Sequence, residues 1–260
     1  MKIVVTNDDG IAARGLWVLA KALSQVGKVI VVAPDKEQSG VGTAVSLHQL
    51  IKMHRVKPKV PEIEAYAIDG TPADSVILAL TRLADDRLDL VVSGINHGPN
   101  VGENVLISGT VGAALQGYLY GFPSIAISVD SLDNPYLDTA AELAALLAQK
   151  VESKSLPAHF FLNVNLPNVT QDQIKSIEVT RLANVSHTDM VKEENKRGAG
   201  YYRLIRRKID KPSERGTDVW AIEQDIISIT PLHIGLAGNS SPRLPASLGD
   251  ELMRELTKKR

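Results

Sequence analysis

The sequence contains no cysteine, only 4% of its residues are aromatic, and its formal net charge is −1. The missing cysteine excludes disulfides and thiolate metal sites and suits a reducing compartment, so we expect a cytoplasmic protein. The near-zero charge excludes a strong field that would attract duplex nucleic acid or an anionic membrane surface. No run of about 18 apolar residues predicts a membrane-spanning helix. The chain also begins with a strand-like segment rather than an export signal.

What the sequence does contain is a regular alternation of strand-like and helical segments over residues 1–165. At 260 residues, 44% of them apolar and 23% charged, it is long enough for one α/β core with an appendage. Apolar runs predict strands at 3–5, 29–33, 89–93, 124–129 and 160–164, and helical spacing predicts helices at 11–27, 72–84, 108–121 and 136–151. Because strands that alternate with helices form parallel sheets, we predict an α/β fold with a Rossmann-like, doubly wound, mostly parallel sheet.

The remaining residues, 166–260, are predicted to form a β-rich extension. Segments 176–182 and 201–209 alternate as strands and are separated by the charged stretch 192–197, and 226–230 adds one more strand. Leucines spaced four residues apart in 246–260 predict a final helix with one apolar face, which packs on its own subunit or on a neighbour.

Residues 36–70 are less regular than the segments around them. A polar, glycine-bearing stretch is followed by alternating segments near 50–56 and 65–68, which predicts an inserted hairpin or edge strands.

Two adjacent carboxylates, Asp8 and Asp9, follow the first predicted strand and precede the first helix. Asn7 and Gly10 mark the turn between them, at the sheet edge where open α/β folds bind their ligands. Like charges side by side stay ionised only when a cation or several hydrogen-bond donors share them. Oxygen ligands in a turn indicate Mg²⁺ or Mn²⁺. The alternative is that one carboxylate caps the helix and the other is solvated.

Two polar loops follow other predicted strands at the same edge. Ser39 could offer a hydroxyl oxygen to a metal, and Gly40 allows close backbone approach, although such residues are common in ordinary turns. The loop 93–104 is rich in glycine and asparagine, and an asparagine oxygen such as that of Asn96 is a suitable ligand for a hard metal. A long polar loop after a buried strand indicates function more than simple mobility.

Ser108, Gly109 and Thr110 open a predicted helix. Unpaired backbone N–H groups and two hydroxyls make this turn a candidate anion site, and the same residues are compatible with an ordinary N-cap at Ser108. The chain has neither a P-loop pattern nor a GxGxxG after its first strand.

A divalent cation held by oxygen atoms beside a phosphate-sized anion site indicates metal-assisted hydrolysis of phosphate esters. We expect an activated water to attack phosphorus, in preference to Asp8 or Asp9 acting as a nucleophile that forms an aspartyl-phosphate. His97 is a weak candidate for a general base, because loop histidines are often only solvated.

The chain resembles the SurE family, the stationary-phase survival proteins, which are metal-dependent nucleotidases acting on nucleoside monophosphates. The similarity extends over residues 3–232 and is carried by TNDDG, APDKEQSGVG, DGTPADSV, DLVVSGINHGPNVGENVLISGTVGAA, FLNVNLP and DIISITPL. The resemblance implies 5′-nucleotidase activity, leaves additional 3′ activity open, and implies a homodimer or homotetramer that exchanges segments of residues 166–260.

The resemblance also implies roles for individual residues. It implies one divalent cation per subunit on Asp8, Asp9, Ser39 and Asn96, catalytic roles for Asp8, Asp9 and Asn7, and a phosphate pocket of Gly40, Ser108, Gly109 and Thr110. Ile107 stands where tyrosine is frequent in the family, a difference expected to alter which base or leaving group is accepted.

Two other classes of function remain open from the sequence. One is a non-catalytic module that binds nucleotides or phosphate for regulation, and the other is a structural protein whose polar loop is an interaction surface. Bare carboxylates repel phosphate unless a cation intervenes, so Asp8 and Asp9 favour the enzyme.

Overall fold

The computed structural model describes residues 1–83, 88–184, 187–196, 199–208, 212–235 and 253. The predicted terminal helix at 246–260 therefore lies almost entirely outside the described residues. Among the described residues, no helix is long and apolar enough to cross a membrane.

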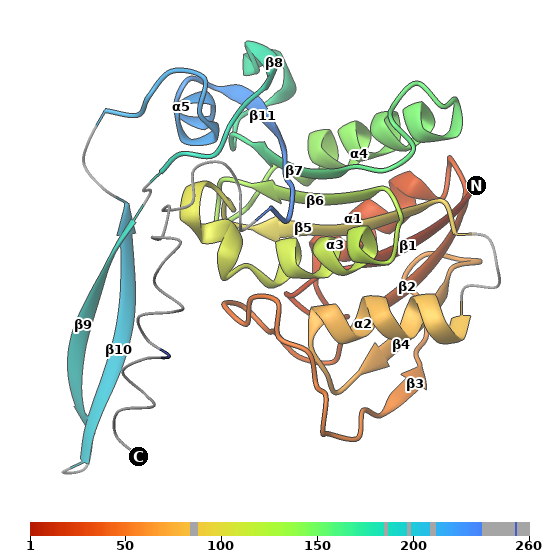
Figure 1. Cartoon of the computed structure of the whole chain (residues 1–260), viewed down its shortest axis with the longest axis horizontal. Helices are drawn as coiled ribbons and strands as arrows, with labels where there is room; N and C mark the ends of the chain where they lie inside the picture. The colour runs from red at the N-terminus through yellow and green to blue at the C-terminus, as the bar shows by residue number, and fades with distance from the viewer. Residues whose placement is uncertain (84–87, 185–186, 197–198, 209–211, 236–252, 254–260) are drawn as a thin grey trace.

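A nine-stranded sheet forms the body of the molecule, with the strand order β3-β4-β2-β1-β5-β6-β7-β11-β8 (Figure 1). Six neighbouring strands, β4 to β7 in that order, are parallel, whereas β3 and β11 pair antiparallel to β4 and β7. The strands of this sheet are β1 (Lys2–Thr6), β2 (Lys28–Pro34), β3 (Met53–Arg55), β4 (Glu64–Ile68), β5 (Leu90–His97), β6 (Ser124–Val129), β7 (Phe161–Leu166), β8 (Ser176–Val179) and β11 (Ile226–Pro231). The predicted α/β fold with a mostly parallel sheet is confirmed.

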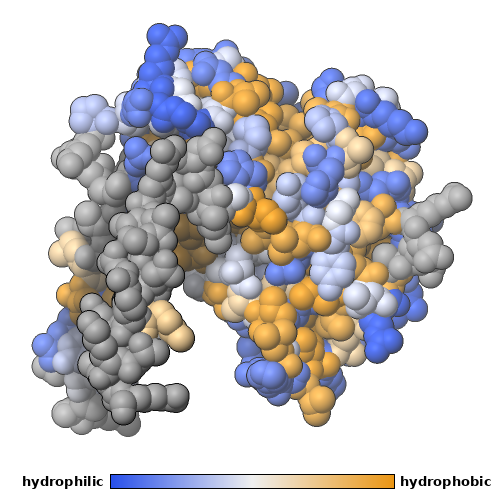
Figure 2. All heavy atoms as spheres, viewed as in Figure 1, coloured by the Kyte–Doolittle hydropathy of each residue, from blue (hydrophilic) through white to orange (hydrophobic). Residues whose placement is uncertain are grey.

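Two pairs of helices cover the two faces of this sheet. Helix α1 (Arg14–Leu23) packs beside α4 (Leu137–Glu152), and α2 (Pro72–Leu78) packs beside α3 (Gly109–Leu119). In Figure 2 the face toward the viewer carries apolar areas among charged residues. Fully buried side chains such as Ile3, Leu16 and Ile125 form the larger core between the sheet and the α1–α4 pair. The sheet is therefore doubly wound, as its alternating sequence predicts.

Strand order reverses between β1 and β5. The chain moves outward from β1 through β2 to β4, then returns to β5 on the other side of β1 and continues outward to β7. Ligands of open α/β sheets bind outside the carboxyl ends of the strands at such a switch point. Asp8 follows β1 and Asn96 lies near the end of β5, so the sequence candidates flank this position.

Residues beyond 166 contribute to the sheet and also leave it. Strands β11 and β8 extend the sheet beyond β7, and the short helix α5 (Asp218–Glu223) precedes β11. Within the described part of the chain, strands β9 (His187–Lys196) and β10 (Ala199–Lys208) pair only with each other and form a hairpin beside the body (Figure 1).

Three shorter helical segments complete the fold. They are η1 (Ala79–Leu83), which prolongs α2, η2 (Gly102–Leu106), which precedes α3, and η3 (Gln171–Gln173).

Two element predictions need correction. The charged residues 192–196 do not separate strands but belong to β9, where Lys192 pairs with Arg203; residue 197 lies outside the described residues. Strand β5 continues to His97, beyond the predicted end at residue 93. Backbone pairing with β6 resumes after a bulge, at Asn96 and His97, and so does not depend on apolar side chains.

Candidate active site

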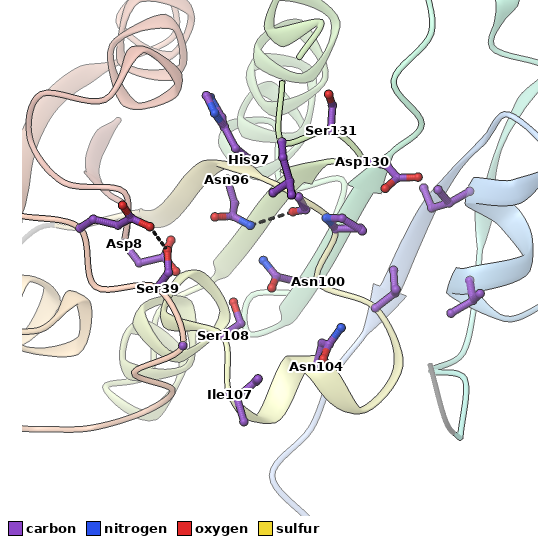
Figure 3. Close-up of a pocket in the computed structure, with 18 residues that line it drawn as sticks. Asp8, Ser39, Asn96, His97, Asn100, Asn104, Ile107, Ser108, Asp130 and Ser131 are labelled. Atoms are coloured by element: carbon purple, nitrogen blue, oxygen red, sulfur yellow. Dashed lines mark hydrogen bonds between the residues drawn. The ribbon is translucent and has the colours of Figure 1, made fainter. Parts of the chain in front are cut away.

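A cavity of about 660 Å³ lies at the switch point of the sheet (Figure 3). One end, which we call the carboxylate end, is lined by Asp8, Glu37, Ser39, Gly40, Asn96, His97 and Ser108. The opposite end, which we call the apolar end, is defined by Val101, Val219 and Ile222. In Figure 3, Asp8 and Ser39 lie on one side of the cavity and the blue ribbon of α5 on the other.

Asp8 is almost completely buried, with 4% of its surface exposed. Its carboxylate accepts a hydrogen bond from the Thr110 hydroxyl, and the Gln38 N–H donates to its main-chain carbonyl at 2.7 Å. Burial raises the pKa of the Asp8 carboxyl above its ordinary value, and the Thr110 hydrogen bond opposes that rise. The charged form of the Asp8 carboxylate is therefore destabilised, and a positive charge beside it would stabilise that form.

The beginning of α3 packs directly against Asp8. A Cβ atom added to Gly109 would lie 2.7 Å from the Asp8 Cβ, which is closer than real Cβ contacts. Glycine is therefore needed at 109 so that the helix can bring Thr110 within hydrogen-bonding distance of Asp8.

Asp9 and Asn7 hold buried oxygen atoms without hydrogen-bond partners. The unpaired atoms are Oδ2 of Asp9 and Oδ1 of Asn7. Burial, followed by the nearby Asp8 charge, raises the pKa of Asp9 to about 7, although the His97 backbone N–H lowers it. Buried oxygens without partners cost free energy, so a cation or a ligand is expected to meet them.

Neither Asp8 nor Asp9 caps the first helix. Helix α1 begins at Arg14, and its N-cap residue, Ala13, offers no side-chain hydrogen bond. The alternative that one of the two carboxylates serves as a helix cap is therefore wrong.

Asn96 and Ser39 complete the carboxylate end. The Asn96 Nδ2 donates to the Gly98 carbonyl at 2.7 Å, and Figure 3 shows the Asn96 oxygen on the side of Asp8 and Ser39. The Ser39 hydroxyl donates to Glu37 Oε1 at 2.8 Å, which directs the hydroxyl proton toward Glu37 and leaves the oxygen lone pairs as acceptors. Glu37 was not recognised from the sequence, because an acid in a polar loop carries no periodic signal.

The four residues expected to bind phosphate occupy two different depths. Gly40 and Ser108 line the cavity, and the Ser108 Oγ also accepts from the Val111 N–H as the N-cap of α3. Gly109 and Thr110 are buried behind Asp8 and do not line the cavity. Of this set, Gly40 and Ser108 are the residues placed to touch a ligand.

Asparagines fix the loop that follows β5. The Asn100 N–H donates to Asn165 Oδ1 at 2.8 Å, and its side-chain Nδ2 donates to the Ser128 hydroxyl at 2.9 Å. Asn163 and Asn165 in turn donate to the Asn100 carbonyl. The loop is therefore held on β6 and β7, and the asparagines of FLNVNLP serve to position it.

Negative charge dominates the lining of the cavity. Asp8, Glu37 and Asp130 contribute carboxylates, and neither Lys nor Arg occurs among the described residues that line it. No group of three or more His, Cys, Asp or Glu suited to a metal ion occurs among the described residues. The candidate ligands are instead two carboxylates with amide and hydroxyl oxygens, a donor set that fits a hard divalent cation.

The fold and cavity define a doubly wound α/β protein with an acidic ligand site at its switch point. The family model described as Survival protein SurE matches residues 3–189. The protein named 5′-nucleotidase SurE from Dehalococcoides mccartyi (strain CBDB1) is 48% identical over 235 residues, which cover 90% of this chain and 89% of that protein. The chain belongs to the SurE family.

More distant relatives agree with this assignment. The 5′-nucleotidase SurE of Legionella pneumophila (strain Paris) is 41% identical over 237 residues, which cover 91% of this chain and 92% of that protein. The crystal structure of the SurE protein from Aquifex aeolicus is similar with a TM-score of 0.79 at 33% identity, and the match covers 98% of this chain and 100% of that one. The resemblance read from the sequence motifs is confirmed.

Proposed function

We propose that this protein is a metal-dependent phosphomonoesterase that hydrolyses nucleoside monophosphates to nucleoside and phosphate at the switch-point cavity. The observation that carries the proposal is buried Asp8 at one end of a cavity lined by no described Lys or Arg, followed by partly buried Asp9, which does not itself line the cavity; both carboxyls have raised pKa values, and Asp9 has a buried oxygen without a partner. The relatives named 5′-nucleotidase SurE support 5′-monophosphates as substrates. Activity on 3′-monophosphates is part of the proposal.

One divalent cation per subunit, Mg²⁺ or Mn²⁺, would be held by Asp8, Asp9, Ser39 and Asn96. When bound, it supplies positive charge to the phosphate and lowers the pKa of a nearby water. A phosphate dianion entering an acidic cavity is repelled without such a charge, which favours the enzyme over a metal-free phosphate-binding module. The unpaired oxygen atoms of Asn7 and Asp9 support a cation at this end.

The chain's own residues hold and orient the reacting groups. Thr110 donates to Asp8 and keeps that carboxylate directed across the start of α3. Ser108 and Gly40, the latter with a left-handed φ of 76°, line the cavity where the phosphate would lie. Since Asp8 and Asp9 are committed to the cation, we propose that water, rather than either carboxylate, is the nucleophile.

The nucleoside would extend toward the apolar end. Val101, Val219 and Ile222 offer apolar surface there, whereas the carboxylate end is polar. A cavity with these two ends suits a substrate that has a charged group at one end and a sugar and base at the other.

Chelation tests the proposal directly. Hydrolysis of a panel of 5′- and 3′-nucleoside monophosphates is measured after EDTA treatment and after addition of Mg²⁺ or Mn²⁺ in excess. We expect activity to vanish with EDTA and to return with one of the cations. Binding of Mn²⁺ is measured separately by titration calorimetry, without substrate. Turnover that persists in EDTA, or phosphate binding without turnover in every metal, would contradict the proposal.

We also propose that residues 166–260 serve assembly into a dimer or tetramer, while residues 1–165 carry the metal and phosphate part of the site. One face of the β9–β10 hairpin exposes Val191, Tyr202 and Leu204, each more than half accessible. Exposed apolar surface on a two-stranded arm is typical of an interface. Light scattering on the full chain and on the Leu204→Glu variant tests this, because the variant should shift toward the monomer.

A further inference from the structure

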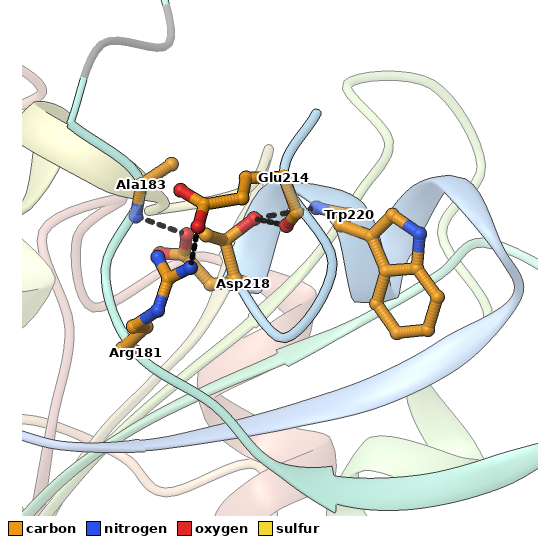
Figure 4. A network of polar contacts seen from close by, with 6 residues as sticks. Arg181, Ala183, Glu214, Asp218 and Trp220 are labelled. Carbon is orange, nitrogen blue, oxygen red and sulfur yellow. Dashed lines mark hydrogen bonds and ion pairs between the residues drawn. The ribbon is translucent and has the colours of Figure 1, made fainter. Parts of the chain in front are cut away.

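Asp218 is a fully buried carboxylate far along the chain from the residues already described. None of its surface is exposed, and it stands at the first position of α5. Its Oδ2 accepts the Gly102 N–H at 2.8 Å, and its Oδ1 accepts the N–H groups of Ala183 and Val219, both at 2.9 Å. One side chain thus joins three segments: the segment after β5, the chain before β9, and α5. Figure 4 shows its contact with Ala183.

Asp218 is not needed as the N-cap of α5. The Thr217 Oγ1 already accepts the Trp220 N–H at the start of α5, so the helix has its N-cap. Burial raises the pKa of Asp218, and the three backbone N–H groups lower it. Burial of a carboxylate costs free energy of folding unless the group is hydrogen-bonded. The hydrogen bonds from Gly102 and Ala183 therefore stabilise the buried Asp218 side chain.

Apolar contacts join the same three segments. Val101, next to Gly102, forms a buried cluster with Val219 and Ile222 of α5, and Ala183 packs against that cluster. Three of these residues, Val101, Val219 and Ile222, line the cavity. The hydrogen bonds of Asp218 therefore lie directly behind the apolar end.

The hairpin is tied to this point at its base. The Asp218 N–H donates to the Arg181 carbonyl at 2.9 Å, and the Arg181 N–H donates to the Gly216 carbonyl at 3.1 Å. Arg181 also pairs with Glu214 at 2.5 Å, an ion pair visible in Figure 4. The chain entering β9 and the chain leaving β10 are thus fastened together beside Asp218.

We infer that Asp218 is a positioning residue, which holds the apolar end of the cavity in the shape that receives the nucleoside and links that end to the base of the β9–β10 hairpin. The inference rests on the proposed nucleotidase function. Asp218 touches neither the carboxylate end nor any reacting atom. Its loss should weaken binding of the nucleoside while the chemistry at phosphorus continues.

The test compares a substrate that reaches the apolar end with one that lacks a nucleoside. Kinetics of the full chain are measured in saturating Mn²⁺ on AMP and on p-nitrophenyl phosphate. For Asp218→Asn, which has the same shape but places an amide NH₂ against a backbone N–H, we expect KM for AMP to rise about tenfold with kcat within about twofold. The kcat/KM for p-nitrophenyl phosphate should change by less than about twofold.

Two other variants complete the experiment. Asp225→Asn removes a half-exposed carboxylate that pairs with Lys175 just after α5, and should leave both substrates unaffected. Ile222→Ala removes apolar surface from the same end of the cavity without touching Asp218, and should raise KM for AMP selectively even where Asp218→Asn folds poorly.

The outcomes separate the two proposals. Equal losses on both substrates, or an unchanged KM for AMP in Asp218→Asn or in Ile222→Ala, would overturn the positioning role. A wild-type chain that hydrolyses neither substrate would overturn the proposed function instead.

Discussion

The two ends of the cavity are built in opposite ways. At the carboxylate end, buried Asp8 is followed by partly exposed Asp9, whose pKa the Asp8 charge helps to raise, and one side-chain oxygen each of Asn7 and Asp9 lacks a hydrogen-bond partner. At the apolar end, Val101, Val219 and Ile222 are packed together, and the buried acid behind them, Asp218, has accepted three hydrogen bonds. The negative charge at the carboxylate end is not balanced by the described residues that line the cavity, whereas the carboxylate behind the apolar end is stabilised by hydrogen bonds from the protein itself.

This difference indicates that different parts of the chain form the two ends of the cavity and serve different steps. The carboxylate end comes from the turns after β1 and β2, the last residues of β5 and the N-cap of α3, and the parallel sheet brings the ends of these strands to one edge. The apolar end needs α5, which belongs to the region beyond residue 166. Chemistry and recognition of the leaving group are therefore expected to respond to different substitutions.

The largest expected effect comes from Asp8→Asn. The neutral amide keeps the shape but cannot balance a cation, and kcat should fall by about 10³-fold or more, since even one lost transition-state donor costs about 10²–10³. Stability should not fall, because burial already disfavours the charged carboxylate. Initial rates on AMP with circular dichroism check this, and exposed Asp35→Asn at the same sheet edge is the control. Near-normal turnover in Asp8→Asn would remove the carboxylate end from the mechanism.

The Thr110→Val variant tests whether the hydrogen bond from Thr110 to Asp8 contributes to metal binding and activity. Valine matches threonine in shape but donates no hydrogen bond, so the buried carboxylate loses its side-chain partner. Substitution of such supporting partners typically costs about 10–100-fold in metal affinity or activity. Calorimetric titration with Mn²⁺ and the kcat on AMP should both register the loss. An unchanged Mn²⁺ affinity would show that α3 plays no part in holding the cation.

Asp9→Asn should stabilise the metal-free protein at neutral pH. The pKa of Asp9 is raised from 3.8 to about 7 in the folded state, so the folded chain holds a proton that the unfolded chain has released. Its contribution to stability is full below pH 3.8 and is lost as pH rises through about 7.

The variant lacks this loss, so its Tm at pH 8 in EDTA should exceed that of the wild type. Asp9 is partly exposed, so after allowance for solvent screening we expect a rise of about 2–4 °C, which corresponds to about 1 kcal/mol. The difference should shrink at pH 5 and should reverse when Mn²⁺ is added, because only the wild type keeps the full ligand set. Thermal melts that show a less stable variant at both pH values would refute the electrostatic account.

Ile107→Tyr probes recognition and should have the smallest effect. Ile107 lines the cavity and is 41% exposed, so a tyrosine ring can lie over a bound base. Stacking of a base on an aromatic ring is worth about 1–3 kcal/mol, and at a partly open site we expect KM for AMP to fall about fivefold. Ribose 5-phosphate, which has no base, is the matched substrate, and its KM should not change. A parallel fall for both substrates would place the ring against the sugar or phosphate.

Local patterns predicted most of the body. Strand β6 has the bounds expected from its apolar run, and α3 begins after Ser108 as its hydroxyl and the following glycine indicate. The sequence does not predict the end of β5, because Asn96 and His97 pair with β6 through their backbone after a bulge, which no side-chain pattern reveals. The charged part of β9 was missed for a related reason: a hairpin outside the main sheet needs no alternation of apolar residues.

The candidate site was predictable where several polar residues or glycines cluster after a strand, and a single acid in a turn gave no signal. Asp8 and Asn96 lie at strand ends, which topology brings to one edge. Glu37 lies in the turn after β2 and Asp130 directly follows β6, but each is a single acid without a distinctive pattern around it. Asp218 reads in the sequence only as an acid at the start of a helix. Its partner Gly102 lies 116 positions away, a distance over which periodicity carries no information.

The long reach of these contacts bears on the order in which the molecule assembles. Thr110 meets Asp8 across 102 positions and Asp218 meets Gly102 across 116, so neither contact can form while only one partner has been synthesised. A nascent chain still attached to the ribosome at about residue 200 already contains Asp8, Asn96 and Thr110 but not α5. Arrested translation products of that length should therefore bind a cation. They should discriminate among leaving groups only after α5 has been synthesised and has packed against the body.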